Sequence, residues 1–210
     1  FDLETPYGYG GPLSNTDDEK FLKKAQDLFF KWATKNNIVC QFVRFHPLIG
    51  NIKYFKNLDK IILERQNCYT KISYIKENLQ SFKPSVRNKI RKAFKNKLTI
   101  KISTEKEEFE NFKKLYFNHL HKIKAKKFYY FNEDYFLKLY NFISNYGFIV
   151  SVNNEKQNTL GSSLFFGNEN YLHYHLTAIS KKNEFPGINN YLLFNAYIEA
   201  KEKKFKLCNL

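Results

Sequence analysis

The sequence predicts a mixed α/β fold (α+β in type), in which a mixed β-sheet is flanked by helices. Hydrophobic residues make up 43% of the 210 residues and aromatic residues 18%, which is enough to bury a substantial core. Apolar residues recur at helical spacing in several segments, whereas β-branched and aromatic residues gather in others. Because both kinds of segment follow one another along the chain, we expect helices that pack on a sheet.

The N-terminal part begins with a turn segment rich in Gly and Pro over residues 1–15. Acidic residues then suit the positive end of a helix over 18–36, whose apolar positions repeat at helical spacing. Residues 38–45 are β-branched and aromatic and predict a strand, and a second strand is expected over 67–75. Pro84 stands at the expected start of the next helix.

The C-terminal part has a clearer pattern. Turns at 153–154 and 167–168 separate three strands that we expect to form antiparallel hairpins. Pro186-Gly187 opens the last helix. The expected strands of this part are 98–103, 147–152, 159–166, 171–178 and 205–210, and the expected helices are 105–123, 133–144 and 188–203.

This order of elements over residues 98–210 is similar to that of the GNAT acyltransferase fold. We therefore divide the chain at residue 97 and expect tandem GNAT-like halves, with 1–97 incomplete and 98–210 truncated at its end. The chain starts at Phe1 and contains no Met, which suggests a piece of a longer protein. Architecture alone does not fix the chemistry, which depends on the residues of a site.

Three short segments concentrate residues that are rare elsewhere in the chain. They are the tyrosine- and glycine-rich segment 2–12, the segment Arg44-Phe45-His46-Pro47-Leu48 with Asn51, and Leu172-His173-Tyr174-His175-Leu176. Together with the basic helix 87–93, they resemble the motifs of the FemAB/FemX aminoacyltransferases, which have a degenerate GNAT domain after a second α/β region. The resemblance spans nearly the whole chain.

The resemblance implies transfer of an aminoacyl or acyl group to an amine or hydroxyl of a peptidoglycan precursor or another surface glycan. It also implies an aminoacyl-tRNA or acyl-CoA as the donor substrate, with no tightly bound cofactor. The alternative is a non-catalytic, basic module that binds tRNA or another nucleic acid. Direct attack by an acceptor amine is favoured, because no Ser-His-Asp or Cys-His order is legible for a covalent intermediate.

The first group of candidate site residues lies near the N-terminus. His46 is a candidate general base, although a histidine at a strand end that bonds only to backbone is as good an interpretation. Arg44, two residues earlier on the expected strand, is a candidate for a carboxylate or phosphate, or for a structural ion pair. Tyr7, Tyr9 and Asn51 are expected to contact the substrate, although a glycine-rich turn with tyrosines also occurs for structural reasons.

The second group lies in the C-terminal half. His173 and His175 alternate along a strand, so both should lie on one face with Tyr174 opposite. They are expected to line a pocket where the central strands separate, with His175 as the second catalytic candidate. A polar sheet face under the last helix is the alternative. A metal is not expected, because no third ligand is evident.

Anionic parts of the substrates have their own candidates. Arg87 and Arg91 lie one turn apart on the helix from Pro84 and are expected to hold phosphates, although solvated basic residues are common on such helices. Gly187 and Asn189 stand at the start of the last helix, where backbone N–H groups attract anions. Gly187 is the single glycine there, so the pyrophosphate loop of simple GNAT enzymes is degenerate.

The net charge and the cysteine content indicate which partners and which cellular compartment to expect. The formal net charge of +15 favours anionic partners such as tRNA, a phosphorylated precursor or, peripherally, an anionic membrane surface. Most of this charge is scattered lysine, so solvated surface is the plainer interpretation. Three cysteines without a CxxC pair favour a reducing compartment, and each is expected to be buried. No apolar stretch is long enough to span a bilayer, and we expect a cytoplasmic protein.

Overall fold

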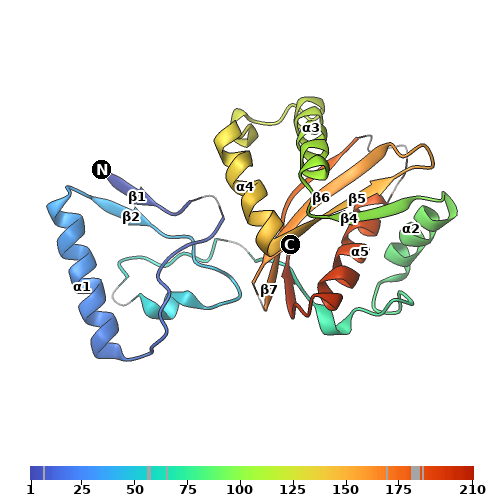
Figure 1. Cartoon of the computed structure of the whole chain (residues 1–210). Helices are drawn as coiled ribbons and strands as arrows, with labels where there is room; N and C mark the ends of the chain where they lie inside the picture. The colour runs from blue at the N-terminus through green and yellow to red at the C-terminus, as the bar shows by residue number, and fades with distance from the viewer. Residues whose placement is uncertain (7, 56–57, 65, 169, 181–184, 186) are drawn as a thin grey trace. The chain divides into compact units, whose positions relative to one another are not determined.

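The computed structural model describes residues 1–6, 8–55, 58–64, 66–168, 170–180, 185 and 187–210. The chain forms two compact units, Phe1–Asn67 and Cys68–Leu210, both drawn in Figure 1. The boundary between the two units therefore lies after residue 67, whereas the sequence suggested a boundary at residue 97. Residues 69–71 pair with the last strand of the chain, and the helix that begins at Pro84 packs on the last helix. These contacts make residues 68–97 part of the second unit.

The second unit is built on a six-stranded mixed sheet, as the sequence predicts. Its strand order is β3-β8-β7-β6-β5-β4, and every pairing is antiparallel except the parallel pair β7–β8. The strands are β3 Tyr69–Lys71, β4 Thr99–Ser103, β5 Gly147–Asn153, β6 Thr159–Gly167, β7 Tyr171–Ile179 and β8 Leu207–Asn209.

Helices cover both faces of this sheet, and each face has its own core (Figure 1). Helices α2 (Pro84–Lys95) and α5 (Ile188–Glu202) lie on one face, with Phe148 and Val150 of β5 beneath them. Helices α3 (Lys106–Lys122) and α4 (Glu133–Tyr146) lie on the other face, above Ile149. Because β5 is covered on both sides, its sequence is a nearly continuous apolar run.

A buried polar cluster fastens α3 to the sheet. The carboxylate of Glu108 accepts a hydrogen bond of 2.6 Å from Ser151 Oγ and pairs with Lys101 Nζ at 2.6 Å. Ser151 Oγ also lies 2.9 Å from Ser162 Oγ. The charge of Glu108 is thus compensated in a core position, as burial of a carboxylate requires.

Strand β7 pairs with β8 along its first three residues. Parallel pairing with β8 joins only Tyr171–His173 to Leu207–Asn209. Within the described residues, β7 continues from residue 174 to Ile179 with β6 as its sole sheet neighbour. The last paired position of β7 and β8 is His173 opposite Asn209.

The first unit is small. Strands β1 (Asp2–Glu4) and β2 (Cys40–Phe42) form a two-stranded parallel sheet, and helix α1 (Glu19–Lys35) runs between them in sequence. A short 3-10 helix, η1, covers Asn51–Tyr54. Asp18 caps α1 by accepting a hydrogen bond of 2.9 Å from the Lys20 amide.

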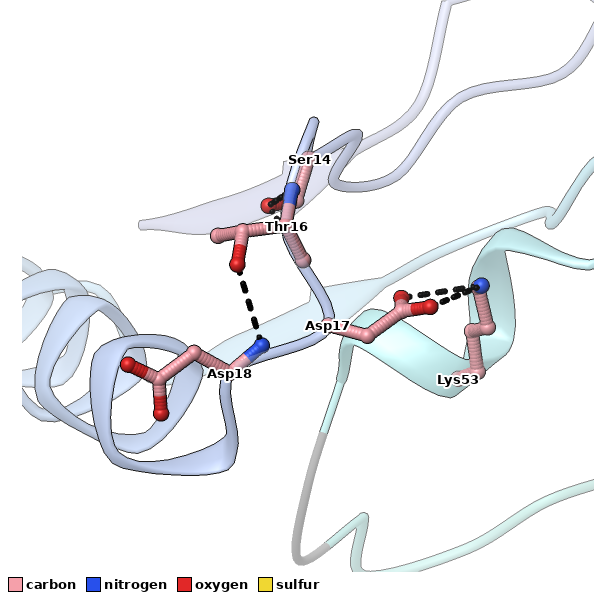
Figure 2. A network of polar contacts seen from close by, with 5 residues as sticks. All are labelled: Ser14, Thr16, Asp17, Asp18 and Lys53. Atoms are coloured by element: carbon pink, nitrogen blue, oxygen red, sulfur yellow. Dashed lines mark hydrogen bonds and ion pairs between the residues drawn. The ribbon is translucent and has the colours of Figure 1, made fainter.

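The segment that enters α1 is held by the polar contacts drawn in Figure 2. Ser14 Oγ donates to the Thr16 carbonyl, and Thr16 Oγ1 accepts from the Asp18 amide at 3.1 Å. The Asp17 carboxylate pairs with Lys53 Nζ of η1 at 2.9 Å. This contact ties the start of α1 to the 3-10 helix that follows β2.

Several predicted elements are shorter or more exposed in the structure. The strand expected over 38–45 is regular only at β2. Its last ladder contact with the N-terminal segment is the hydrogen bond from Thr5 N to the Phe42 carbonyl. The strand expected over 67–75 is β3 followed by the 3-10 helix η2 (Ile72–Tyr74). In α1 only Leu22 and Ala33 are buried, and Cys40 and Cys68 are exposed rather than buried. No helix in the described part of the chain has the length and apolarity needed to cross a membrane.

Candidate functional site

The residues singled out from the sequence fall into two groups, one in each unit. Tyr9, Arg44, His46 and Asn51 belong to the first unit, and Tyr7 lies outside the described residues. The histidines of β7 belong to the second unit, as do the basic residues of α2 and the start of α5. Each group is described by itself.

Asn51 is the centre of the first group, and its contacts are all to backbone. Its Nδ2 donates to the Gly10 carbonyl at 2.8 Å and to the Pro12 carbonyl at 3.3 Å, while its Oδ1 accepts from the His46 amide at 3.0 Å. Asn51 is 1% exposed. A Cβ on Gly11 would lie 3.1 Å from Asn51 Nδ2 at a φ of +96°, so glycine is needed there. Asn51 is thus a clamp between the glycine-rich turn and the histidine segment.

His46 is engaged with its own loop. Its Nδ1 accepts from the amides of Leu48 at 3.1 Å and Ile49 at 3.3 Å. A neutral ring that accepts at Nδ1 carries its proton on Nε2, so it has no lone pair left to remove a proton from a substrate. Partial burial lowers the pKa of His46, which favours this neutral form. The geometry matches a loop-forming histidine better than a general base.

Tyr9 and Arg44 surround this loop. The Tyr9 ring meets the His46 ring edge-on at 5.2 Å, and the Tyr9 hydroxyl accepts from Asn67 Nδ2 at 3.0 Å. Arg44 is exposed, and its guanidinium lies over the Phe42 ring at 5.8 Å. Arg44 lies beyond the end of β2, outside the regular strand.

The second group centres on a β-bulge in β7. Leu164 of β6 pairs with Leu176, whereas the next residue, Phe165, pairs with Tyr174. His175 is therefore the extra residue of the bulge, and bulges redirect side chains. The change is visible in the packing, because Tyr174 faces the α2/α5 core whereas Leu176 is buried in the α3/α4 core.

His175 points toward α4. Its Nε2 lies 2.7 Å from the hydroxyl of Tyr135, and its ring lies 4.9 Å from the ring of Phe166. His173 also contacts Phe166, at 6.1 Å, so the two histidines share a face as the strand alternation predicts. Burial and the neighbouring His173 lower the pKa of His175 to about 4. His175 is therefore neutral at physiological pH.

Tyr135 was not identified from the sequence. It stands in the first turn of α4, where the Asn132 side chain caps the helix by accepting from the Tyr135 amide at 2.9 Å. Its ring stacks on Phe131 at 4.1 Å. The cap and the stack fix the ring, so the hydroxyl has a set position against His175. An Asn followed by two acidic residues does signal a helix start, but nothing local signals the histidine partner.

His173 has a partner on β8. Its Nδ1 lies 3.4 Å from Asn209 Nδ2, across the last paired position of the two strands. On the opposite face, Tyr174 is hydrogen-bonded to Ser163 and Thr177, and burial raises the pKa of its hydroxyl. The α4 face thus carries a line of polar side chains, Tyr135, His175, His173 and Asn209.

The start of α5 is the third feature of the second unit. Gly187 caps the helix at a φ of +108°, and a Cβ there would lie 2.7 Å from Lys89 Cβ of α2. The backbone of α2 at Lys89 therefore packs closely against this helix end. Arg87 is partly buried, whereas Arg91 and Asn189 are exposed. The described residues contain no group of three or more His, Cys, Asp or Glu side chains placed to hold a metal.

Neither a protein-family model nor a curated protein matches the sequence. Solved structures do match. L-PGS from Bacillus licheniformis has a TM-score of 0.64 at 14% identity over 92% of this chain and 60% of its own. FemX has a TM-score of 0.57 at 16% identity over 69% of this chain and 52% of its own. The fold is GNAT-like.

A third match is a C-terminal domain from Agrobacterium fabrum described as that of a lysylphosphatidylglycerol synthetase, with a TM-score of 0.54 at 12% identity over 69% of this chain. The chain covers 45% of that domain, and so spans about half to three fifths of the length of these three structures. Similarity at such identities establishes the GNAT-like fold and leaves the chemistry to the residues described above.

The neutral state of His175 predicts acid sensitivity. In the unfolded chain a histidine titrates near its usual pKa of 6.5, whereas folded His175 titrates at about 4. The unfolded state therefore binds more protons between these values, and stability falls as the pH falls through this window, by roughly 3 kcal/mol in total. Urea unfolding of the wild type and H175Q from pH 7.5 to pH 4 checks this. The wild type should lose more stability than H175Q, and parallel curves would contradict the assignment.

The clamp at Asn51 predicts a structural role. Asn51→Ala leaves the Gly10 carbonyl, the Pro12 carbonyl and the His46 amide without this partner, so it should lower the free energy of unfolding by about 2–3 kcal/mol. Asn15→Ala, at an exposed asparagine of the same unit, should change it by less than about 0.5 kcal/mol. Chemical denaturation followed by Trp32 fluorescence compares the two. If both substitutions lowered the free energy of unfolding equally, Asn51 would not be a structural clamp.

Proposed function

We propose that this chain is part of a Fem-like aminoacyltransferase, which transfers an aminoacyl or acyl group to an amine or hydroxyl of a peptidoglycan precursor or surface glycan. The observation that carries the proposal is the hydrogen bond between Tyr135 and His175 on the α4 face, at the bulge in β7. The motif resemblance and the fold shared with FemX and L-PGS support the same class of reaction.

The chemistry begins with direct attack of the acceptor amine on the carbonyl carbon of the donor. A bond forms between nitrogen and that carbon, and the bond from the carbon to the donor oxygen or sulfur breaks. The amine must lose a proton as it attacks, and the leaving atom must gain one. His175 is neutral at physiological pH, so together with the Tyr135 hydroxyl it can accept the first proton without being deprotonated beforehand.

His175 replaces His46 as the proposed general base. Both rings are held by hydrogen bonds, but those of His46 come from backbone amides of its own loop and those of His175 include a side-chain hydroxyl that itself donates or accepts. A hydroxyl–imidazole pair can pass a proton between its two members. The low pKa of His175 limits its strength as a base, because a general base works best when its pKa lies near the operating pH.

The start of α5 is the proposed site for the anionic part of the donor. Helix N-termini carry partial positive charge, and Lys89 of α2 is a basic residue whose backbone lies against Gly187. Arg87 and Arg91 extend basic character along α2. We favour aminoacyl-tRNA as the donor, because the net charge of +15 suits a polyanion and the single glycine of this helix start suits a pyrophosphate poorly. The reaction would take place in the cytoplasm.

A radiolabel transfer assay tests the proposal. Charged tRNAs and acyl-CoAs are offered in parallel to a peptidoglycan-precursor mixture, and label on the precursor is counted. Transfer from tRNA supports the favoured donor, whereas transfer only from an acyl-CoA moves the reaction to glycan acylation. Salt-sensitive tRNA binding without transfer from either donor would overturn the enzyme and favour a nucleic-acid-binding module.

Variants of α4 test the proposed site. Tyr135→Phe removes the hydroxyl that bonds His175 and should lower kcat at least tenfold, and His175→Gln should lower it about 100-fold or more. Tyr140→Phe is the matched control, because Tyr140 is on the same helix and packs its ring on Phe109 at 5.3 Å. Steady-state kinetics of the three variants measure kcat and so test whether Tyr135 and His175 are the catalytic pair. An unchanged kcat in Y135F, or an equal loss in Y140F, would exclude the pair as the catalytic group.

A further inference from the structure

The segment between α3 and α4 is unusually basic. Residues 122–129, which we call the basic connection, contain four lysines, and the sequence has no Asp or Glu from position 111 to position 132. The two acidic residues that open α4 pair with lysines outside the basic connection, Lys113 and Lys138. The acidic residues nearest in sequence therefore do not neutralise the basic connection, which lies at the top of the second unit in Figure 1.

Three apolar side chains of the basic connection are exposed together with its lysines. Ile123 is 57% exposed, Phe128 66% and Tyr129 41%. A single exposed apolar side chain is common on protein surfaces and needs no explanation. Three of them interleaved with lysines match the chemistry of a lipid interface, where basic side chains meet anionic headgroups and apolar side chains enter the layer beneath.

The backbone of the basic connection is held by its own hydrogen bonds. The Ala125 amide donates to the Leu120 carbonyl at 3.0 Å, which closes the end of α3. The Tyr116 hydroxyl donates to the Tyr129 carbonyl at 3.0 Å, and Lys127–Tyr129 form a 3-10 helix. The exposed side chains thus project from an ordered backbone, which reduces the conformational entropy that binding must overcome.

We propose that the basic connection binds the surface of an anionic membrane. Its lysines contact the headgroups, while Ile123 and Phe128 insert into the interfacial layer. A nucleic acid would also attract the lysines and would stack on aromatic rings, but it offers no apolar layer for an aliphatic side chain such as Ile123. The exposed isoleucine therefore favours lipid over nucleic acid.

Membrane binding has a consequence for the proposed site. The basic connection is followed closely by α4, whose first turn carries Tyr135. Binding would therefore bring the Tyr135–His175 pair close to the headgroups, which favours a lipid-linked acceptor over a freely diffusing one. This choice of acceptor rests on the proposed function, whereas the membrane binding itself does not.

Vesicle sedimentation tests the binding. The probes are vesicles of phosphatidylcholine alone and of an equimolar mixture with phosphatidylglycerol. The wild type should sediment with the anionic vesicles only, and added salt should weaken its binding. The triple variant K124Q/K126Q/K127Q should bind about 100-fold more weakly, at about fivefold for each lysine. Lys122 is left unchanged, because its Nζ donates to the Ser180 carbonyl at 2.6 Å.

A matched control separates local binding from attraction by the net charge. The variant K76Q/K106Q/K156Q removes three exposed lysines from other elements of the same unit. Because these lysines lie outside the basic connection, its affinity for anionic vesicles should fall by less than about threefold. Equal losses in the two triple variants would overturn the proposal.

Substitutions of Phe128 test insertion. Phe128→Ser should weaken vesicle binding about tenfold and leave its salt dependence unchanged, because apolar area is lost and no charge is. Phe128→Trp combined with Trp32→Phe makes residue 128 the single tryptophan of the chain. Brominated acyl chains should quench its fluorescence in anionic vesicles. Sedimentation without quenching would contradict insertion.

Competition with tRNA tests the other partner. If K124Q/K126Q/K127Q weakens tRNA binding and leaves vesicle binding unchanged, the basic connection is a nucleic-acid surface and the membrane proposal is wrong. Vesicle binding requires neither donor nor acceptor, so it is measured independently of transfer. Transfer to a soluble precursor without vesicle binding overturns this inference alone. Vesicle binding without transfer from any donor supports the inference and overturns the proposed function.

Discussion

The parallel pairing of β7 with β8 is the constraint on which the rest of the second unit depends. It joins Tyr171–His173 to Leu207–Asn209 and so places β8 between β7 and β3 in the sheet. Helix α5 links these two strands in sequence and must cross one face of the sheet to do so, as parallel strands require. Because α5 covers one face, the other face is left to α3 and α4, and Tyr135 of α4 meets His175 there.

The bulge at His175 changes which face of the sheet the side chains of β7 reach. Without the extra residue, strand alternation would keep Leu172, Tyr174 and Leu176 on one face of the sheet. With it, Leu172 belongs to the α2/α5 core and Leu176 to the α3/α4 core, so both ends of the strand bury an apolar side chain. The histidine stands at the residue where the change occurs, which places its ring against the first turn of α4.

The fold of residues 98–210 was largely predictable because its signals are local. Caps, turns and helical periodicity placed each helix and strand to within a few residues, from Asn132 before α4 to Gly187 before α5. The boundary near residue 97 was not predictable, because β3 joins the sheet through pairing with β8, more than 130 residues later. In α1 the apolar pattern predicted the helix but not which of its faces is buried.

The candidate site was likewise only partly predictable from the sequence. Rare residues in short segments drew attention to His46 and His175, yet their different hydrogen-bonding roles arise from partners that sequence spacing does not show. His46 bonds to amides two and three residues ahead, whereas Tyr135 reaches His175 from 40 residues away. The sequence suggested that Asn51 contacts the substrate. In the structure its side chain bonds to the backbone of the glycine-rich turn and of His46. Asn209 drew no attention, because a buried amide at a strand end has no local signature.

The state of the histidine rings tests the central claim most directly. Long-range proton–nitrogen NMR of protein labelled in its histidines reports both the titration and the tautomer of each of the five rings. The account predicts that His175 titrates near pH 4 and that neutral His46 carries its proton on Nε2. A His175 ring that titrates near 6.5, as an exposed imidazole does, would contradict the neutral Tyr135–His175 pair on which the proposed mechanism rests.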